Sequence, residues 1–105
     1  MFERTMSSEE LIAFKEGQIP LFDAVFNFTK YGLAMTILNG KYGVIDYNHN
    51  VVLENRFDNI YFSKGGYIIA FVGKKYKIFT KDGYPLVSRE FDMFHDAKRY
   101  AEFFA

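Results

Sequence analysis

The stretch that decides the fold is residues 39–46, which read Asn39-Gly40-Lys41-Tyr42-Gly43-Val44-Ile45-Asp46. Asn-Gly is the strongest short signal for a β-hairpin, because both central residues of a type I′ turn need a positive φ angle. The residues before this turn alternate between two apolar sets, as an extended strand does. We therefore expect a strand over residues 31–38, a tight turn at Asn39-Gly40 and an antiparallel return strand over 41–46.

The return strand contains a glycine, Gly43, which indicates a β-bulge or the close approach of a neighbouring aromatic ring. After the strand, residues 46–50 predict a second turn, because Asp and Asn side chains hydrogen-bond turn backbone. The same residues begin like a calcium loop, but such loops need Gly and Glu where this chain has Val51 and Phe57. The turn is therefore favoured, followed by a third strand that runs from Val51 towards Phe57.

The pattern recurs from Phe57 to Asp92 at an offset of 34 residues, which relates Tyr42 to Tyr76 and Asp58 to Asp92. We expect each of these two aspartates to hydrogen-bond the turn after its aromatic neighbour. The second copy predicts turns over 63–66, 73–75 and 81–83, and strands over 67–72, 76–80 and 84–87. The strand over 67–72 is apolar on both faces, which is typical of a central strand covered on both sides.

Helical signals lie at both ends of the chain. Ser7 and Glu10 form a capping box that predicts a helix over residues 8–16. A second apolar stripe has helical spacing and consists of Phe91, Phe94, Ala97, Ala101 and Phe104. An alternative for this last segment is a truncated third repeat that stays extended, since Tyr100 aligns with Tyr31. The helix is favoured, because alanine is poor strand material.

Together these elements predict an α+β fold, an antiparallel β-meander of about six strands from two β-hairpin repeats. A short N-terminal and a C-terminal helix flank it. Residues 1–105 are expected to form a single domain, with the N-terminal helix and lead-in over 1–20. Repeat 1 spans 21–55, repeat 2 spans 56–89 and the C-terminal helix lies in 90–105.

The repeated unit resembles the bacterial WG-repeat family, with about two degenerate copies over residues 19–95. The segments that carry the resemblance are Gly32-Leu33-Ala34, the hairpin over 39–46, Val51-Val52 and Phe57-Asp58. The signature pair of the family is Trp-Gly; here Tyr42-Gly43 replaces it, and the second copy has Tyr76-Lys77. The resemblance implies β-hairpin repeats of bacterial or phage-related proteins, without an established enzymatic activity.

Composition excludes several classes of function. Thirteen basic and thirteen acidic residues cancel, so the chain lacks the global positive field of a dedicated nucleic-acid binder. There is no cysteine, and only two histidines, so neither a metal site, a cofactor site nor a catalytic residue is expected. No apolar run reaches the ~20 residues of a membrane span, and the polar start is not a signal peptide. We expect a cytoplasmic protein that is not an enzyme.

One segment of the second copy combines aromatic and basic residues, and we take it as the candidate binding site: Lys74, Lys75, Tyr76, Lys77, Lys81 and Tyr84. The leading hypothesis is a protein-interaction module, by family analogy a phage or mobile-element factor that binds a host protein, because tyrosine-rich patches serve as binding hot spots. A homodimer is a second form of this hypothesis. The alternative is a nucleic-acid-binding module that uses the hairpin over 74–81. Lysines on an edge strand also serve to block pairing between sheet edges.

Overall fold

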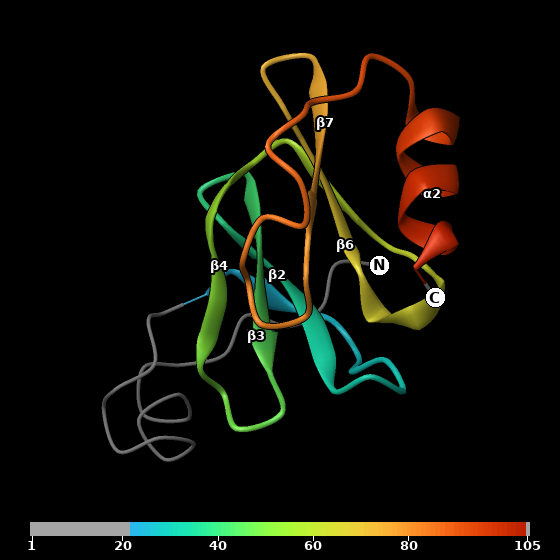
Figure 1. Cartoon of the computed structure of the whole chain (residues 1–105). Helices are drawn as coiled ribbons and strands as arrows, with labels where there is room; N and C mark the ends of the chain where they lie inside the picture. The colour runs from blue at the N-terminus through green and yellow to red at the C-terminus, as the bar shows by residue number, and fades with distance from the viewer. Residues whose placement is uncertain (1–21, 105) are drawn as a thin grey trace. The chain divides into compact units, whose positions relative to one another are not determined.

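Figure 1 shows the chain as a computed structural model, which describes residues 22–104. The helix predicted over residues 8–16 lies outside the described residues. The chain divides into two compact units, with the boundary between Asn55 and Arg56. The single-domain organisation over 1–105 stays a prediction.

The first unit is built on a four-stranded sheet with the order β1-β2-β3-β4. Its strands are β1 (Ala24–Val25), β2 (Leu33–Leu38), β3 (Lys41–Asp46) and β4 (Val51–Phe57). The predicted hairpin is confirmed, since β2 and β3 pair antiparallel from Leu33 opposite Asp46 to Leu38 opposite Lys41. Asn39 and Gly40 have φ angles of 54° and 78°, as a type I′ turn requires. β1 was not predicted, because a two-residue strand has no periodicity of its own.

One buried cluster of the first unit lies on one face of this sheet. Phe22, Ala34 and Ile45 form a buried cluster there, and Val25, Phe28 and Leu38 pack against it. Ala34 and Ile45 are cross-strand partners in the hairpin. Leu33 and Val44 are buried as well, so the buried residues of this hairpin belong to both of the alternating sets.

The second unit contains a three-stranded sheet with the order β5-β6-β7. Its elements are β5 (Asn59–Phe62), a short 3₁₀ helix η1 (Lys64–Gly66), β6 (Ile68–Val72), β7 (Lys75–Phe79) and the helix α2 (Phe94–Phe103). β6 is the central strand, as predicted. Three successive residues of β6, Ile68, Ile69 and Ala70, are fully buried, so both faces of the strand are covered.

Two boundaries in the second unit differ from the prediction. The turn before β7 is made by Gly73 and Lys74, with φ angles of 59° and 64°, so Lys75 already belongs to the strand. The strand predicted over 84–87 is not formed, which is a correction to the expected meander. In this segment Pro85 forms an isolated bridge to Phe79, and Leu86 donates its N–H to the Ile78 carbonyl oxygen. The next bridge to β7 joins Phe91 to Tyr76, so residues 86–90 stand opposite only Lys77 and Ile78, and a regular ladder cannot continue.

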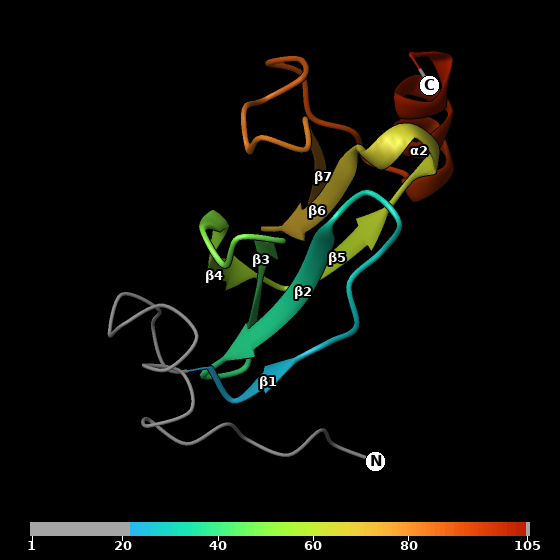
Figure 2. The same ribbon diagram turned by 90° about the horizontal axis from the view of Figure 1, so that it is seen from below.

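The C-terminal helix is confirmed, and the extended third repeat is not formed. α2 packs on the sheet of the second unit (Figures 1 and 2). A buried cluster joins Ala97 and Ala101 of the helix to Ile69, Ile78 and Phe91. Phe91 precedes the helix and bridges to Tyr76, so the stripe that predicted the helix begins in extended chain. Seven strands and one helix therefore form the described part of the chain, and none of the helices within residues 22–104 has the length and apolar character to cross a membrane.

Candidate functional site

The glycine of the first copy's signature pair makes room for a polar bridge between strands. The Asn55 side-chain amide in β4 donates to the Thr36 hydroxyl in β2 at 3.0 Å, and also contacts the carbonyl oxygens of Thr36 and Lys41. A Cβ atom at Gly43 would lie 2.6 Å from the Leu53 carbonyl oxygen and 3.0 Å from the Asn55 side-chain amide. The close approach predicted at Gly43 is confirmed, but the neighbour is β4 and its amide, and the expectation of an aromatic ring was wrong.

The second copy lacks every part of this bridge. At the same offset of 34 residues, Ala70 stands for Thr36, Lys77 for Gly43 and Arg89 for Asn55. The register is retained, because Ala70 pairs with Lys77 as Thr36 pairs with Gly43. Ala70 has no hydroxyl to accept a hydrogen bond, and the Lys77 side chain occupies the space that Gly43 leaves open. The second copy therefore keeps the hairpin and loses the link to its third segment.

Two of the four lysines in the predicted site, Lys75 and Lys77, form ion pairs. Lys75 binds Asp92, which raises the pKa of Lys75, first through the hydrogen bond and then through the charge of the carboxylate. Lys77 lies 3.3 Å from Glu90, measured from Nζ to Oε2. Lys74 is exposed in the tight turn. Asp92 therefore pairs with the β7 hairpin.

The two tyrosines of the predicted site have different surroundings. Tyr76 packs against Phe71 and Phe94, with ring centroids 4.6 and 5.8 Å away, and belongs to the edge of the buried cluster. Tyr84 is 70% exposed in the next turn, close in sequence to the exposed Lys81. The structure thus places the partly buried Tyr76 against the core of the unit, and the binding role of the six residues stays a prediction.

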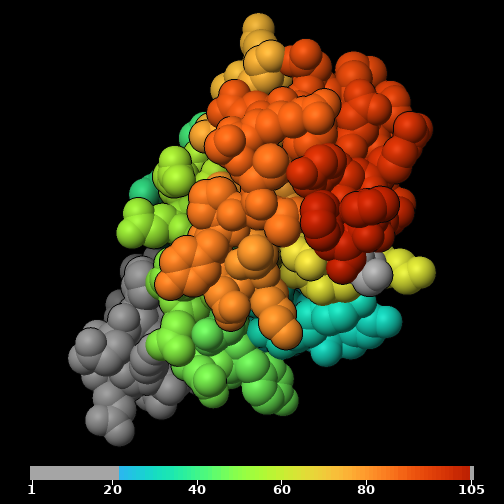
Figure 3. Space-filling view, viewed as in Figure 1, coloured from blue at the N-terminus to red at the C-terminus, as the bar shows by residue number. Residues whose placement is uncertain are grey.

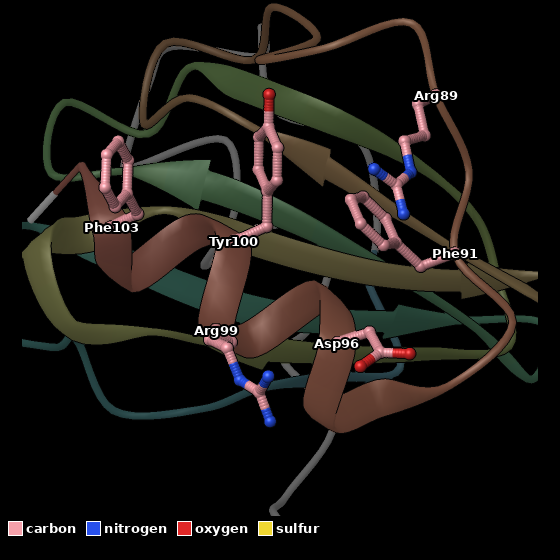
Figure 4. A pocket seen from close by; sticks show the side chains of 6 residues that line it. All are labelled: Arg89, Phe91, Asp96, Arg99, Tyr100 and Phe103. Atoms are coloured by element: carbon pink, nitrogen blue, oxygen red, sulfur yellow. The ribbon is translucent and has the colours of Figure 1, made fainter.

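A more open aromatic and basic surface lies along α2, in residues that the sequence did not single out. Residues 80–91 and α2 lie side by side on the face seen in Figure 3. Between them is a cavity of about 430 Å³ (Figure 4), here called the aromatic groove, which is lined by Arg89, Phe91, Asp96, Arg99, Tyr100 and Phe103. Four of these residues come from α2 at spacings of three and four, so helical spacing was the signal that could have found them.

The rings of the groove form a connected ladder. Phe91 and Tyr100 have centroids 5.4 Å apart, and Phe104 lies 5.4 Å from both Tyr100 and Phe103. The ladder begins at Phe91, which is 3% exposed, and ends at Phe103, which is 83% exposed. It therefore leads from the buried cluster of the unit to its surface.

The charge of the groove is basic. The Arg89 guanidinium stacks on Phe91 with its Cζ 4.4 Å from the ring centroid. Neither Arg89 nor Arg99 forms a salt bridge within the described residues 22–104, and the acid in the groove is Asp96, which contacts His95 at 3.3 Å. Residues 56–105 hold nine Lys and Arg against six Asp and Glu, whereas residues 1–55 hold four against seven. The net charge of the whole chain is therefore zero although its second half is basic.

The predicted turn at residues 46–50 is confirmed. The Asp46 Oδ1 atom accepts hydrogen bonds from the backbone N–H groups of Asn48 and Asn50, each at 2.9 Å. This carboxylate is thus used to hold the turn. Among the residues that the structure describes, no group of three or more His, Cys, Asp or Glu side chains is arranged to hold a metal ion.

The repeated antiparallel hairpins define the class of the protein as a β-repeat module. The model of the WG containing repeat family matches residues 19–42 and 42–76, which is more than half of the chain. The chain belongs to this family, with two copies of the repeat. The two matches end at Tyr42 and Tyr76, the same offset that relates the two hairpins. No curated protein and no solved structure is a match to the chain.

Proposed function

We propose that the chain is a non-enzymatic protein-interaction module whose second unit docks a partner protein in the aromatic groove. The observation that carries this proposal is the ring ladder that ends at Phe103, 83% exposed beside a cavity of about 430 Å³. Membership in the WG containing repeat family supports a β-repeat module, and the groove supplies the surface with which such a module could bind.

An aromatic ring held by other rings is a suitable anchor for a partner. Phe103 meets Phe104 edge to face at 87°, and Phe104 is supported by Tyr100. Large rings that are already ordered lose little conformational freedom on binding, and they dominate the energetics of interfaces. A partner side chain that enters the groove would cover Phe103 and contact Tyr100 and Phe91.

The charges of the groove define the chemistry of the partner. Arg89 and Arg99 flank an apolar floor, and Asp96 offsets only one of them. Complementary charge selects partners and raises association rates. The occupant is therefore a protein segment that carries an apolar or aromatic side chain next to Asp or Glu residues.

Selection from a displayed random-peptide library on the immobilised full chain tests this occupant. We expect enrichment of peptides that combine an apolar residue with acidic neighbours. The dissociation constant of a selected peptide should rise about tenfold or more in Phe103→Ala, which corresponds to about 1.4 kcal/mol. Tyr47→Ala is the control, since Tyr47 is an exposed aromatic residue that does not line the groove.

Two outcomes would contradict the proposal. Equal loss of affinity in Phe103→Ala and Tyr47→Ala would show that the groove does not select the peptide, and enrichment of basic peptides would show that its charge has no role. The homodimer is a separate occupant, tested by sedimentation velocity at rising protein concentration. A dimer that Phe103→Ala dissociates would place a second copy of the chain in the groove in place of a different partner.

The nucleic-acid alternative for the hairpin over 74–81 stays a prediction. Two of its lysines, Lys75 and Lys77, are paired with acids, and Tyr76 packs against Phe71 and Phe94. A gel-shift assay at low salt with a single-stranded oligonucleotide tests it, because binding by lysines is strongest at low ionic strength. A phage or mobile-element role and a cytoplasmic location also stay predictions.

A further inference from the structure

A second cavity of the second unit lies where the first copy has its polar bridge. It has a volume of about 210 Å³ and is lined by three basic residues, Arg56, Lys77 and Arg89, one acid, Glu90, and one hydroxyl residue, Ser88, above the apolar residues Ile78, Phe79, Pro85 and Val87. The bridges of Phe79 to Pro85 and Tyr76 to Phe91 bound the stretch in which residues 87–90 leave β7, after Leu86 has donated its N–H to the Ile78 carbonyl oxygen. The cavity, here called the basic cavity, is the space that this departure opens.

The two arginines of the basic cavity are supported by neighbouring rings. Arg56 lies over Phe57 with its Cζ 4.8 Å from the ring centroid, and Arg89 lies over Phe91 at 4.4 Å. Phe57 and Phe91 are themselves buried. Stacking on a fixed ring limits the freedom of a guanidinium group and leaves its N–H edge available for hydrogen bonds. Neither arginine forms a salt bridge within the described part of the chain.

The charge of the basic cavity exceeds what its own acid can neutralise. Glu90 offsets Lys77 at 3.3 Å, so the lining keeps two positive charges in its arginines. A carboxylate carries one negative charge, whereas a phosphomonoester carries about 1.5 to 2 at neutral pH and has three acceptor oxygens. Guanidinium groups match phosphate oxygens with paired N–H donors, and the Ser88 hydroxyl adds a further donor.

From these observations we propose that the basic cavity is a binding site for a phosphomonoester, with the phosphate on Arg56 and Arg89 and the adjoining apolar group over Val87 and Pro85. The phosphate can belong to a phosphorylated side chain of a protein or to a small phosphorylated molecule. The site shares only Arg89 with the aromatic groove. The proposal therefore goes beyond the docking of a partner in that groove and does not depend on it.

Titration of the full chain with phenyl phosphate, followed by amide chemical shifts, tests the site. We expect saturable shifts at Lys77 and at residues 87–90, and a dissociation constant at least tenfold lower than that for benzoate, which offers a carboxylate on the same ring. The affinity should fall between pH 7 and pH 5, because the second pKa of a phosphomonoester lies near 6 and the monoanion loses one charge. Equal affinity for benzoate, or no binding of phenyl phosphate at millimolar concentration, would overturn the proposal.

Charge-matched variants locate the bound phosphate. Arg56→Gln should weaken phenyl phosphate about tenfold, whereas Lys64→Gln, which removes an exposed cation of the same unit outside both cavities, should leave it unchanged within twofold. Equal effects of the two variants would mean that net charge alone attracts the ligand, which would overturn the site. Arg56 is exposed, and the melting temperature of each variant reports whether the fold is retained.

A triple variant introduces the residues of the first copy's polar bridge into the second copy. The triple substitution Ala70→Thr, Lys77→Gly and Arg89→Asn would supply the hydroxyl, the open space and the amide that form the bridge around Gly43. It should retain the fold and abolish binding of phenyl phosphate. Binding that persists in this folded variant would place the ligand elsewhere.

Two further measurements separate this inference from the proposed function and identify the source of the phosphate. Phe103→Ala should bind phenyl phosphate normally, and Arg56→Gln should bind a library-selected peptide normally, so either proposal can fail alone. A phosphotyrosine peptide that binds tenfold more tightly than phenyl phosphate would indicate a phosphorylated protein. Equal affinities would indicate a small molecule.

Discussion

The two copies of the repeat share a hairpin and differ in how the third segment joins it. In the first copy β4 is a full strand of the sheet, and the Asn55 amide crosses Gly43 to reach Thr36 in β2. In the second copy, the corresponding segment 85–91 forms two isolated bridges to β7 and leaves the basic cavity between them. The comparison teaches that a tight turn with two positive φ angles, Asn39-Gly40 or Gly73-Lys74, is enough to form the hairpin, whereas the third strand joins in full only in the copy that has the signature glycine.

Gly43→Ala is the substitution with the largest expected effect on this difference between the two copies. The new methyl group would lie 2.6 Å from the Leu53 carbonyl oxygen, which is backbone and cannot rotate away. Overpacking of this kind costs about 3 kcal/mol, and we expect a loss of that size in the free energy of unfolding measured with urea.

Lys77→Ala is the matched control for Gly43→Ala, because it makes the same residue at the corresponding position of the second copy. That position already carries a Cβ atom, and the Lys77–Glu90 ion pair is more than one third exposed on both sides. We expect a change within about 0.5 kcal/mol. Similar losses in the two alanine variants would show that Gly43 has no special role.

The polar bridge of the first copy is the next feature to break. Asn55→Ala removes the donor that satisfies the Thr36 hydroxyl, and Thr36 is only 1% exposed. Leaving a buried polar group without its partner costs about 2 kcal/mol. Urea unfolding of the single variants and of Asn55→Ala with Thr36→Ala measures the coupling between the two side chains, which we expect to be about 1 kcal/mol. Strict additivity of the two substitutions would contradict a direct bond between them.

The smallest expected effect concerns the exposed ion pair of the second copy. Asp92→Asn removes the carboxylate that raises the pKa of Lys75, so the pKa of the Lys75 ammonium, followed by ¹⁵N NMR, should fall towards its ordinary value of 10.5. An unchanged Lys75 pKa in the variant would contradict the ion pair.

This ion pair also has a defined dependence on pH. The folded chain binds the Lys75 proton more tightly than the unfolded chain does. The contribution of the ion pair to the free energy of unfolding is therefore complete below the ordinary lysine pKa of 10.5, and it is lost as the pH rises through the raised pKa of Lys75 in the folded chain. Both side chains are largely solvated, so the effect is small. Between pH 6 and pH 9 the stability should not respond to this pair.

Local signals in the sequence were sufficient to predict most of the elements of the fold. Asn39-Gly40 predicted the first hairpin, the two-sided apolar strand predicted the position of β6, and the stripe through Ala97 and Ala101 predicted α2. These signals act over a few residues, because turn angles and periodicity are local properties. The strand predicted over 84–87 failed because residues 86–90 lie between the two bridges while only Lys77 and Ile78 lie opposite them, and this mismatch cannot be seen in the segment itself.

The candidate site was harder to predict than the fold. The lysines over 74–77 are adjacent in the sequence and suggested one surface, but the partners of Lys75 and Lys77 are Asp92 and Glu90 from a later segment. Arg89 comes close to α2 only in the folded chain, where Arg89 and residues of α2 line the aromatic groove together. Such neighbours are set by tertiary packing, so no spacing in the sequence reports them.

The contact between the space at Gly43 and the Leu53 backbone has a consequence for how the two copies can vary. A backbone oxygen is present whatever residue occupies position 53, so no second substitution there can make room for a larger side chain at 43. Position 77 is free of that restriction. In a library of variants we expect the first copy to tolerate few substitutions and the second copy to tolerate many. Positions 77 and 89 are therefore the places where new binding specificities can be introduced.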